Sequence, residues 1–169
     1  MPQELRFIVA LQSALNTPML SWLAFASARF LIFLFPAFLL LQDKSAHLMR
    51  RLALEMGLAA ACAFSFAYLI GELVERTRPY RASMDVTLLA PEPLTRFSFP
   101  SAHASTAFAL AAAVASVSPR FGWLAFLVAT LVSVGRVAIG VHYPTDVLAG
   151  ALLGIGVWYL VQTLLKQWT

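Results

Sequence analysis

Long apolar stretches alternate with short polar segments along this chain. Apolar residues at helical spacing cover residues 4–15 and stop at the polar break 16–18. This first stretch is too short to cross a bilayer, which takes about 20 residues, so we predict a helix lying at the membrane interface. Each longer stretch predicts a membrane-spanning helix. These five stretches are residues 18–41, 50–75, 102–117, 121–139 and 144–165.

Prolines and a serine mark the predicted helix ends. Pro79 closes the second stretch, because proline lacks an amide hydrogen and disfavours helix in the residue before it. Ser101 can cap the third helix, and Pro144 suits the first turn of the fifth. Residues 80–99 form a polar connection that contains two prolines. A connection of this length is usually functional, so we expect it to contribute to a site.

Composition places the whole chain in the membrane. Of the 169 residues, 60% are hydrophobic and 12% are charged, whereas a soluble domain carries about 25% charged residues. A soluble fold could not bury so much apolar surface. We therefore predict an all-α integral membrane helical bundle, a single domain over residues 1–169, with about five transmembrane helices plus the N-terminal interfacial helix.

The charge pattern points to lipid partners. Twelve Lys and Arg against eight Asp and Glu give a net charge of +4, with no basic run. This balance suits anionic lipid headgroups and not nucleic acid, and it leaves the oligomeric state open. Gly150 and Gly154 form a G-x-x-x-G spacing, which lets a neighbouring helix approach closely. We expect that neighbour to belong to the same chain.

Unusual polar residues gather at three predicted helix ends, in segments 76–80, 99–103 and 135–146. A phosphoryl group in transfer carries negative charge on its oxygens, and planar multidentate cations and oriented amides stabilise that charge. Arg78 and Arg136 can supply the cations. The free amides of Ala102 and His103 at the start of a helix, with the Ser101 hydroxyl, can supply the donors.

His142 and Asp146 are four residues apart across the start of the fifth helix. This spacing lets the carboxylate accept a hydrogen bond from one imidazole nitrogen and leave the other free to attack phosphorus. His103 could then protonate the departing oxygen. Two alternatives remain for this pair of residues. It could be a hydrogen-bonded pair without a catalytic role, or it could contribute to a metal site. The surrounding arginines would repel a metal cation, so we expect neither a metal nor another cofactor.

The three segments resemble the signature motifs of the type 2 phosphatidic acid phosphatases, which are related to the vanadium haloperoxidases. The family patterns are K-x-x-x-x-x-x-R-P, P-S-G-H and S-R-x-x-x-x-x-H-x-x-x-D. This chain has G-E-L-V-E-R-T-R-P, P-S-A-H and G-R-V-A-I-G-V-H-Y-P-T-D in the same order, within residues 71–150. The resemblance implies metal-independent catalysis with His142 as nucleophile, Asp146 as its orienting partner and His103 as general acid. It also implies phosphate ligands at Arg78, Ser101 and Arg136.

Three positions depart from the family pattern. Gly71 stands in place of the lysine, Ala102 in place of the glycine and Gly135 in place of the serine. The alanine matters little because a backbone amide makes the contact, but the other two changes remove a cation and a hydroxyl. Arg29, Arg76 and Arg81 are candidates to supply the missing cation.

The resemblance predicts a membrane lipid phosphatase that works through a phosphohistidine. Undecaprenyl diphosphate is the first candidate substrate, because small members of the family often recycle the cell-wall carrier lipid. Phosphatidylglycerol phosphate and lipid A phosphates are alternatives. Alternatives of other classes are a catalytically weakened lipid-phosphate-binding protein and a vanadate haloperoxidase, which the membrane composition disfavours.

Topology predicts where the site lies. Two predicted spans separate the segment at Arg78 from the segment at His142, so both segments emerge on the same side. The opposite side carries the basic residues Lys44, Arg50, Arg51, Arg120 and Lys166. Because cytoplasmic loops are enriched in Lys and Arg, we predict an inner-membrane protein whose site faces the periplasm or the cell exterior.

Overall fold

A computed structural model describes residues 1–40, 45–93 and 95–166 of this chain, and every regular element in these ranges is helical. This confirms the predicted all-α class. Leu41 and Lys44 lie outside the described residues. The helices are α1 (Gln3–Ala14), α2 (Pro18–Phe30), the 3₁₀ helix η1 (Leu31–Leu34), α3 (Phe35–Leu40), α4 (Ala46–Val74), α5 (Pro79–Ala82), α6 (Ala102–Val117), α7 (Pro119–Ala138) and α8 (Pro144–Lys166).

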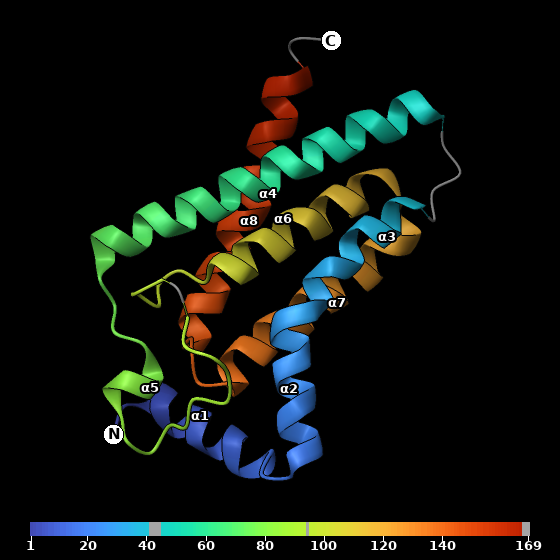
Figure 1. Ribbon diagram of the computed structural model, residues 1–169. Helices are drawn as coiled ribbons and strands as arrows, with labels where there is room; N and C mark the ends of the chain where they lie inside the picture. Colours follow the sequence, from blue (N-terminus) through green and yellow to red (C-terminus); the bar gives the residue numbers. More distant parts are fainter. Residues whose placement is uncertain (41–44, 94, 167–169) are drawn as a thin grey trace.

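Four helical stretches are long and apolar enough to cross a bilayer, namely Pro18–Phe38, Met49–Ala82, Pro119–Ala138 and Pro144–Lys166. The third predicted span, α6, has 16 residues and is about 24 Å long at 1.5 Å per residue. The hydrocarbon core of a bilayer is about 30 Å thick, so α6 falls short of the predicted full span. It lies among α4, α7 and α8 (Figure 1). Helices of the same chain surround it, so its length need not match the bilayer.

The first predicted span is bent. The chain passes from α2 through η1 into α3, and the two α-helices run in different directions (Figure 1). Pro36 explains the bend, because its nitrogen cannot donate to the carbonyl of Ile32 and its ring crowds that carbonyl. The apolar pattern predicted one continuous helix here and did not detect this break.

Two glycines of α8 set its close contact with α6. A Cβ atom added at Gly150 would lie 2.6 Å from the carbonyl oxygen of Ser101, and one at Gly154 would lie 2.0 Å from that of Ser105. The expectation that this G-x-x-x-G face packs within the chain is confirmed. The contact joins two site segments, because the amide of Ser101 donates to the carbonyl of Asp146 at 3.0 Å.

A third glycine sets the contact between α7 and α2. A Cβ atom at Gly135 would lie 2.4 Å from Ser27 Oγ and 2.7 Å from the amide nitrogen of Ala28. No side chain fits between the two helices at this crossing. The glycine that replaces the family serine is therefore required by the packing of α2.

We expect Gly135→Ser to destabilise the protein by about 1–3 kcal/mol, the usual effect of overpacking a core. Thermal unfolding of the detergent-solubilised protein measures this, and Gly156→Ser is the matched control because no atom lies within 4 Å of a Cβ at Gly156. Equal melting temperatures for the two variants would contradict the tight crossing.

Helix α1 lies across the end of the bundle where the long loop and the start of α8 meet (Figure 1). Its Gln12 side chain holds the loop, since Nε2 donates to the carbonyls of Thr87 and Ala138 at 2.7 and 3.0 Å, and Oε1 accepts from the amide of Thr87. The N-terminal helix thus supports the segments that form the site.

Candidate active site

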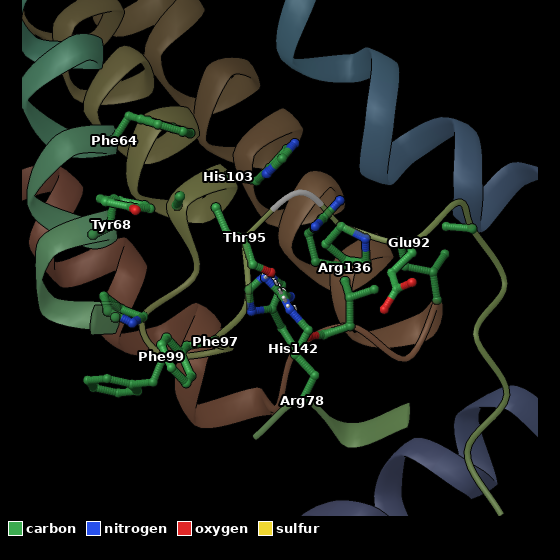
Figure 2. Close-up of a pocket in the computed structure, with 18 of the residues that line it drawn as sticks. Phe64, Tyr68, Arg78, Glu92, Thr95, Phe97, Phe99, His103, Arg136 and His142 are labelled. Atoms are coloured by element: carbon green, nitrogen blue, oxygen red, sulfur yellow. Dashed lines mark hydrogen bonds between the residues drawn. The ribbon is translucent and has the colours of Figure 1, made fainter. Parts of the chain in front are cut away.

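The three motif segments meet at one cavity of about 360 Å³. Six of the predicted site residues line it, namely Arg29, Arg78, Ala102, His103, Arg136 and His142. Figure 2 shows Arg78, Arg136 and both histidines around this space, with Thr95, Phe97 and Phe99 of the long loop on its wall. The predicted convergence of distant segments and the predicted contribution of the loop are both confirmed.

His142 is held by the backbone of the long loop. Its Nδ1 lies 2.7 Å from the carbonyl oxygen of Ser98, and a carbonyl can only accept, so Nδ1 carries the proton. The Nε2 atom is then unprotonated, and it lies 3.5 Å from Nη1 of Arg78. The imidazole is 3% exposed. This arrangement presents one fixed, nucleophilic nitrogen to the cavity.

Asp146 was expected to accept the hydrogen bond from His142, and here the sequence-based prediction is wrong in detail. Asp146 Oδ2 lies 3.6 Å from Nδ1, because the Ser98 carbonyl is nearer and Nδ1 has only one proton to donate. Oδ2 instead accepts from the amide of Tyr143 at 2.8 Å. The fully buried carboxylate thus lies beside the imidazole as a negative charge and fixes the start of α8.

Arg76 binds Asp146 and not the cavity. Its guanidinium donates to Asp146 Oδ1 at 2.6 Å and to Glu4 Oε2 at 2.6 Å, and it lies 3.9 Å over the ring of Tyr143. Glu4 also accepts from the amide and hydroxyl of Thr145. Arg76 is therefore a positioning residue that ties α1 to the carboxylate, which corrects its candidacy as a phosphate ligand.

Arg78 is fixed by loop atoms. Nη1 donates to the carbonyl of Val141 at 2.9 Å, and Nη2 donates to the carbonyl and hydroxyl of Thr95 at 3.1 and 2.8 Å. Only 2% of the residue is exposed. The guanidinium is held in place before any ligand arrives.

Arg136 has unused hydrogen-bonding capacity. It is 7% exposed, and its Nε is buried without a hydrogen-bond partner among the described residues. None of the ion pairs in the described ranges involves Arg78 or Arg136. Uncompensated buried cations are unfavourable, so the cavity is built to receive an anion.

The remaining candidates divide between the cavity and its surroundings. Arg29 lines the cavity. Arg81 is exposed and pairs with Glu92, so it is not free to compensate for the lysine. Ser101 is fully buried, is absent from the cavity lining, and accepts from the amide of Ala104 at 3.4 Å. It caps α6 as predicted, but its expected hydroxyl contact with phosphate is not supported.

Sequence reasoning missed three contributors, namely Glu4, Thr95 and Ser98. Ser98 acts through its carbonyl, which every residue has, so no sequence signal could single it out. Thr95 holds Arg78 from 17 positions away. Glu4 had a weak signal, because a carboxylate stands out in an apolar N-terminal segment.

Burial lowers the pKa of His142 to about 4, although Asp146 acts in the opposite direction. The ordinary value is about 6.5, so the imidazole is neutral at pH 7 and loses its free nitrogen only as the pH falls through about 4. In ¹⁵N-histidine NMR spectra we expect the signal that is missing in His142→Gln to remain unprotonated down to pH 5. Titration near pH 6.5 would contradict the buried, desolvated setting.

The comparisons with known proteins agree with this geometry. Residues 49–169 match the PAP2 superfamily, and the chain belongs to that superfamily. A Sulfolobus acidocaldarius protein named undecaprenyl-diphosphatase is 36% identical over 111 residues, which cover 63% of this chain and 53% of the relative. A Mycobacterium tuberculosis protein named decaprenylphosphoryl-5-phosphoribose phosphatase is 38% identical over 116 residues, which cover 68% of this chain and 62% of the relative.

A solved structure is similar to this chain over nearly its full length. The crystal structure of Aquifex aeolicus LpxE superposes with a TM-score of 0.68 at 26% identity and covers 96% of each chain. Against the two curated relatives, the match spans between about half and two thirds of their length. The chain is an integral membrane protein of the same helical architecture.

Proposed function

We propose that this protein is a metal-independent lipid phosphate phosphatase that works through a phosphohistidine. One observation carries the proposal: two buried guanidinium groups, which form no ion pair in the part of the chain that the structure describes, face the unprotonated Nε2 of a fixed imidazole across one cavity. Guanidinium groups bind phosphate through parallel hydrogen bonds. A phosphate held between Arg78 and Arg136 places its phosphorus within reach of His142.

The reaction then proceeds in two steps. Nε2 of His142 attacks phosphorus, the bond from phosphorus to the leaving oxygen breaks, and His103 donates a proton to that oxygen. A bound phosphate dianion favours the protonated form of His103, because an opposite charge nearby stabilises the imidazolium. Water, deprotonated by His103, next attacks the phosphohistidine and releases inorganic phosphate and neutral His142.

Asp146 acts on this reaction by charge. When the phosphohistidine forms, its ring becomes positive, and the buried carboxylate at 3.6 Å from Nδ1 stabilises that charge while the carbonyl of Ser98 keeps the ring oriented. Arg76 and the amide of Tyr143 hold the carboxylate in place. The N-terminal helix contributes through Glu4 to the same alignment.

The cavity also has room for the start of a lipid tail. Its wall includes Phe25, Phe64, Ala67 and Tyr68 from α2 and α4, and apolar surface of this kind suits a hydrocarbon chain. We take undecaprenyl diphosphate as the first candidate substrate. The archaeal relative is named undecaprenyl-diphosphatase and the mycobacterial relative decaprenylphosphoryl-5-phosphoribose phosphatase, and the prenyl chain in both names supports this choice for this chain.

We further propose that the site faces away from the cytoplasm, in an inner membrane. At the site end, Arg76 and Arg81 pair with carboxylates, and Arg78 and Arg136 are buried. These cations have structural or chemical roles, so they are left out when the basic residues at the two ends of the bundle are compared to assign the cytoplasmic side. The site end keeps the exposed Arg6 and Arg96, whereas the opposite end carries Arg50, Arg120 and Lys166, and this excess favours the cytoplasmic placement of the opposite end.

Phosphate release by the detergent-purified protein tests the proposed function. The substrates are undecaprenyl diphosphate, phosphatidylglycerol phosphate and lipid A, each with and without a chelator. We expect release from at least the first, unchanged by the chelator. Binding without release from all three would favour a lipid-phosphate-binding protein, and loss of release with chelator would overturn the metal-free mechanism.

A further inference from the structure

Arg29 brings a third guanidinium group to the cavity, from a helix that carries none of the motif residues. It lies in the last turn of α2, within the apolar stretch Pro18–Phe38, and it lines the cavity. Among the described residues it takes part in no ion pair. An arginine inside a membrane span is unfavourable and usually marks a functional site.

The packing of α2 on α7 fixes where Arg29 enters. At this crossing a Cβ on Gly135 would lie 2.7 Å from the amide nitrogen of Ala28, so the two backbones are in contact. Arg29 follows Ala28 and Arg136 follows Gly135. Both side chains line the cavity from adjacent helices, and neither forms an ion pair among the described residues, so an anion bound between them would balance both charges.

The three arginines divide the cavity into two ends. Arg78 lies at the nucleophile, with Nη1 at 3.5 Å from His142 Nε2. The charges of Arg136 and Arg78 act on both histidines, whereas the charge of Arg29 acts on His103 and is not among those that act on His142. Arg29 therefore serves the end of the cavity where His103 meets the leaving group, and Arg78 lies beside the nucleophile.

The leaving group differs between the two classes of lipid substrate. In a lipid monophosphate the leaving oxygen is bonded to a carbon of the tail, so nothing beyond it carries charge. In a lipid diphosphate it is bonded to a second, negatively charged phosphate. At roughly 30 Å³ for each water-sized group, a cavity of about 360 Å³ accommodates two phosphates. Phe25 and Phe64 line the same cavity and offer apolar surface to the start of the tail.

We propose that Arg29 binds the phosphate that stays on the lipid, and that it makes the enzyme selective for lipid diphosphates over lipid monophosphates. The proposal rests on the phosphatase activity proposed above. His142 Nε2 forms a bond to the terminal phosphorus, and the bond from that phosphorus to the bridging oxygen breaks. The electron pair stays on the bridging oxygen, whose charge Arg29 stabilises and which His103 protonates. The products are the lipid monophosphate and, after hydrolysis, inorganic phosphate.

Two substrates with the same tail test the proposal. Farnesyl diphosphate and farnesyl monophosphate in detergent micelles are compared by kcat/KM for wild type, Arg29→Ala, Arg29→Lys and the control Arg120→Ala, whose exposed side chain lies at the start of α7. We expect wild type to prefer the diphosphate. Arg29→Ala should lose about 100-fold on the diphosphate, the lower end of the range for removal of one preorganised ligand, and less than about 3-fold on the monophosphate. Arg29→Lys should restore part of the loss.

Each outcome decides one question. Equal losses on both substrates, or no loss on either, would overturn the role of Arg29 in selectivity while leaving the phosphatase activity in place. No phosphate release by wild type from either substrate would instead refute the proposed function itself. Melting temperatures of the four proteins separate a lost contact from a lost fold.

Discussion

Replacing His142 with alanine lowers kcat/KM for phosphate release by about 10⁴-fold or more, since removal of a covalent nucleophile costs up to about 10⁶-fold in well-studied hydrolases. The physical reason is that the Ser98 carbonyl holds the Nδ1 proton of His142 and so keeps its Nε2 unprotonated and fixed at the cavity. Steady-state phosphate release in detergent measures the effect. The shortest hydrogen bond of the ring is to the loop carbonyl of Ser98, and no helix is capped by it, so the variant should keep a cooperative melting transition.

Detection of the phosphohistidine tests directly whether His142 is the nucleophile. Substrate labelled with ³²P in its terminal phosphate should transfer an acid-labile, base-stable label to wild type and none to His142→Ala. His103→Ala keeps the nucleophile, so it should still take up label while turning over slowly. Label that persists in His142→Ala would assign the nucleophile to another residue and overturn the mechanism.

Local chemistry in the sequence was sufficient to predict most helix boundaries. Ser101 and Pro144 begin α6 and α8 at the predicted residues, because capping and proline geometry depend only on neighbouring atoms. The bend at η1 was missed although Pro36 was visible. Hydropathy alone does not distinguish a straight apolar helix from a bent one, and prolines are common within membrane helices.

The candidate site was predicted as a set of residues but not as a set of contacts. Arg78, Arg136 and both histidines line one cavity as expected, because their motif spacing fixes them at helix ends. The partners of Arg76 could not be foreseen, since Glu4 and Asp146 lie 72 and 70 positions away. Asp146 remained the right residue beside His142, but its exact bond depended on a carbonyl that only the folded loop supplies.

We infer that the same contacts compensate for the replacement of the family serine by Gly135. Gly135 is fixed by the crossing with α2, and that crossing brings Arg29 beside Arg136 at the cavity. A serine at position 135 would separate the two helices and withdraw this cation. The close crossing of α2 and α7 at Gly135 therefore has two consequences: position 135 has no hydroxyl, and α2 brings the Arg29 guanidinium to the cavity.

Replacing Arg136 with glutamine should abolish activity and stabilise the protein at the same time. Activity falls by about 10³-fold, the upper range for loss of one preorganised charge ligand. Stability rises because the substitution removes a buried cation that has no carboxylate partner and lies near Arg78 and Arg29. Relief of about 1 kcal/mol would raise the melting temperature by about 2–4 °C.

Arg76→Gln is the matched control for this effect. It also removes a guanidinium near the site, but Arg76 is paired with Glu4 and with the buried Asp146, so its loss leaves a buried carboxylate without its partner. That variant should melt at a lower temperature than wild type, because an unpaired buried charge is strongly destabilising. Inorganic phosphate should raise the melting temperature of wild type and leave that of Arg136→Gln unchanged. If Arg136→Gln melts below wild type and phosphate stabilises both equally, Arg136 is a structural residue and the anion binds elsewhere.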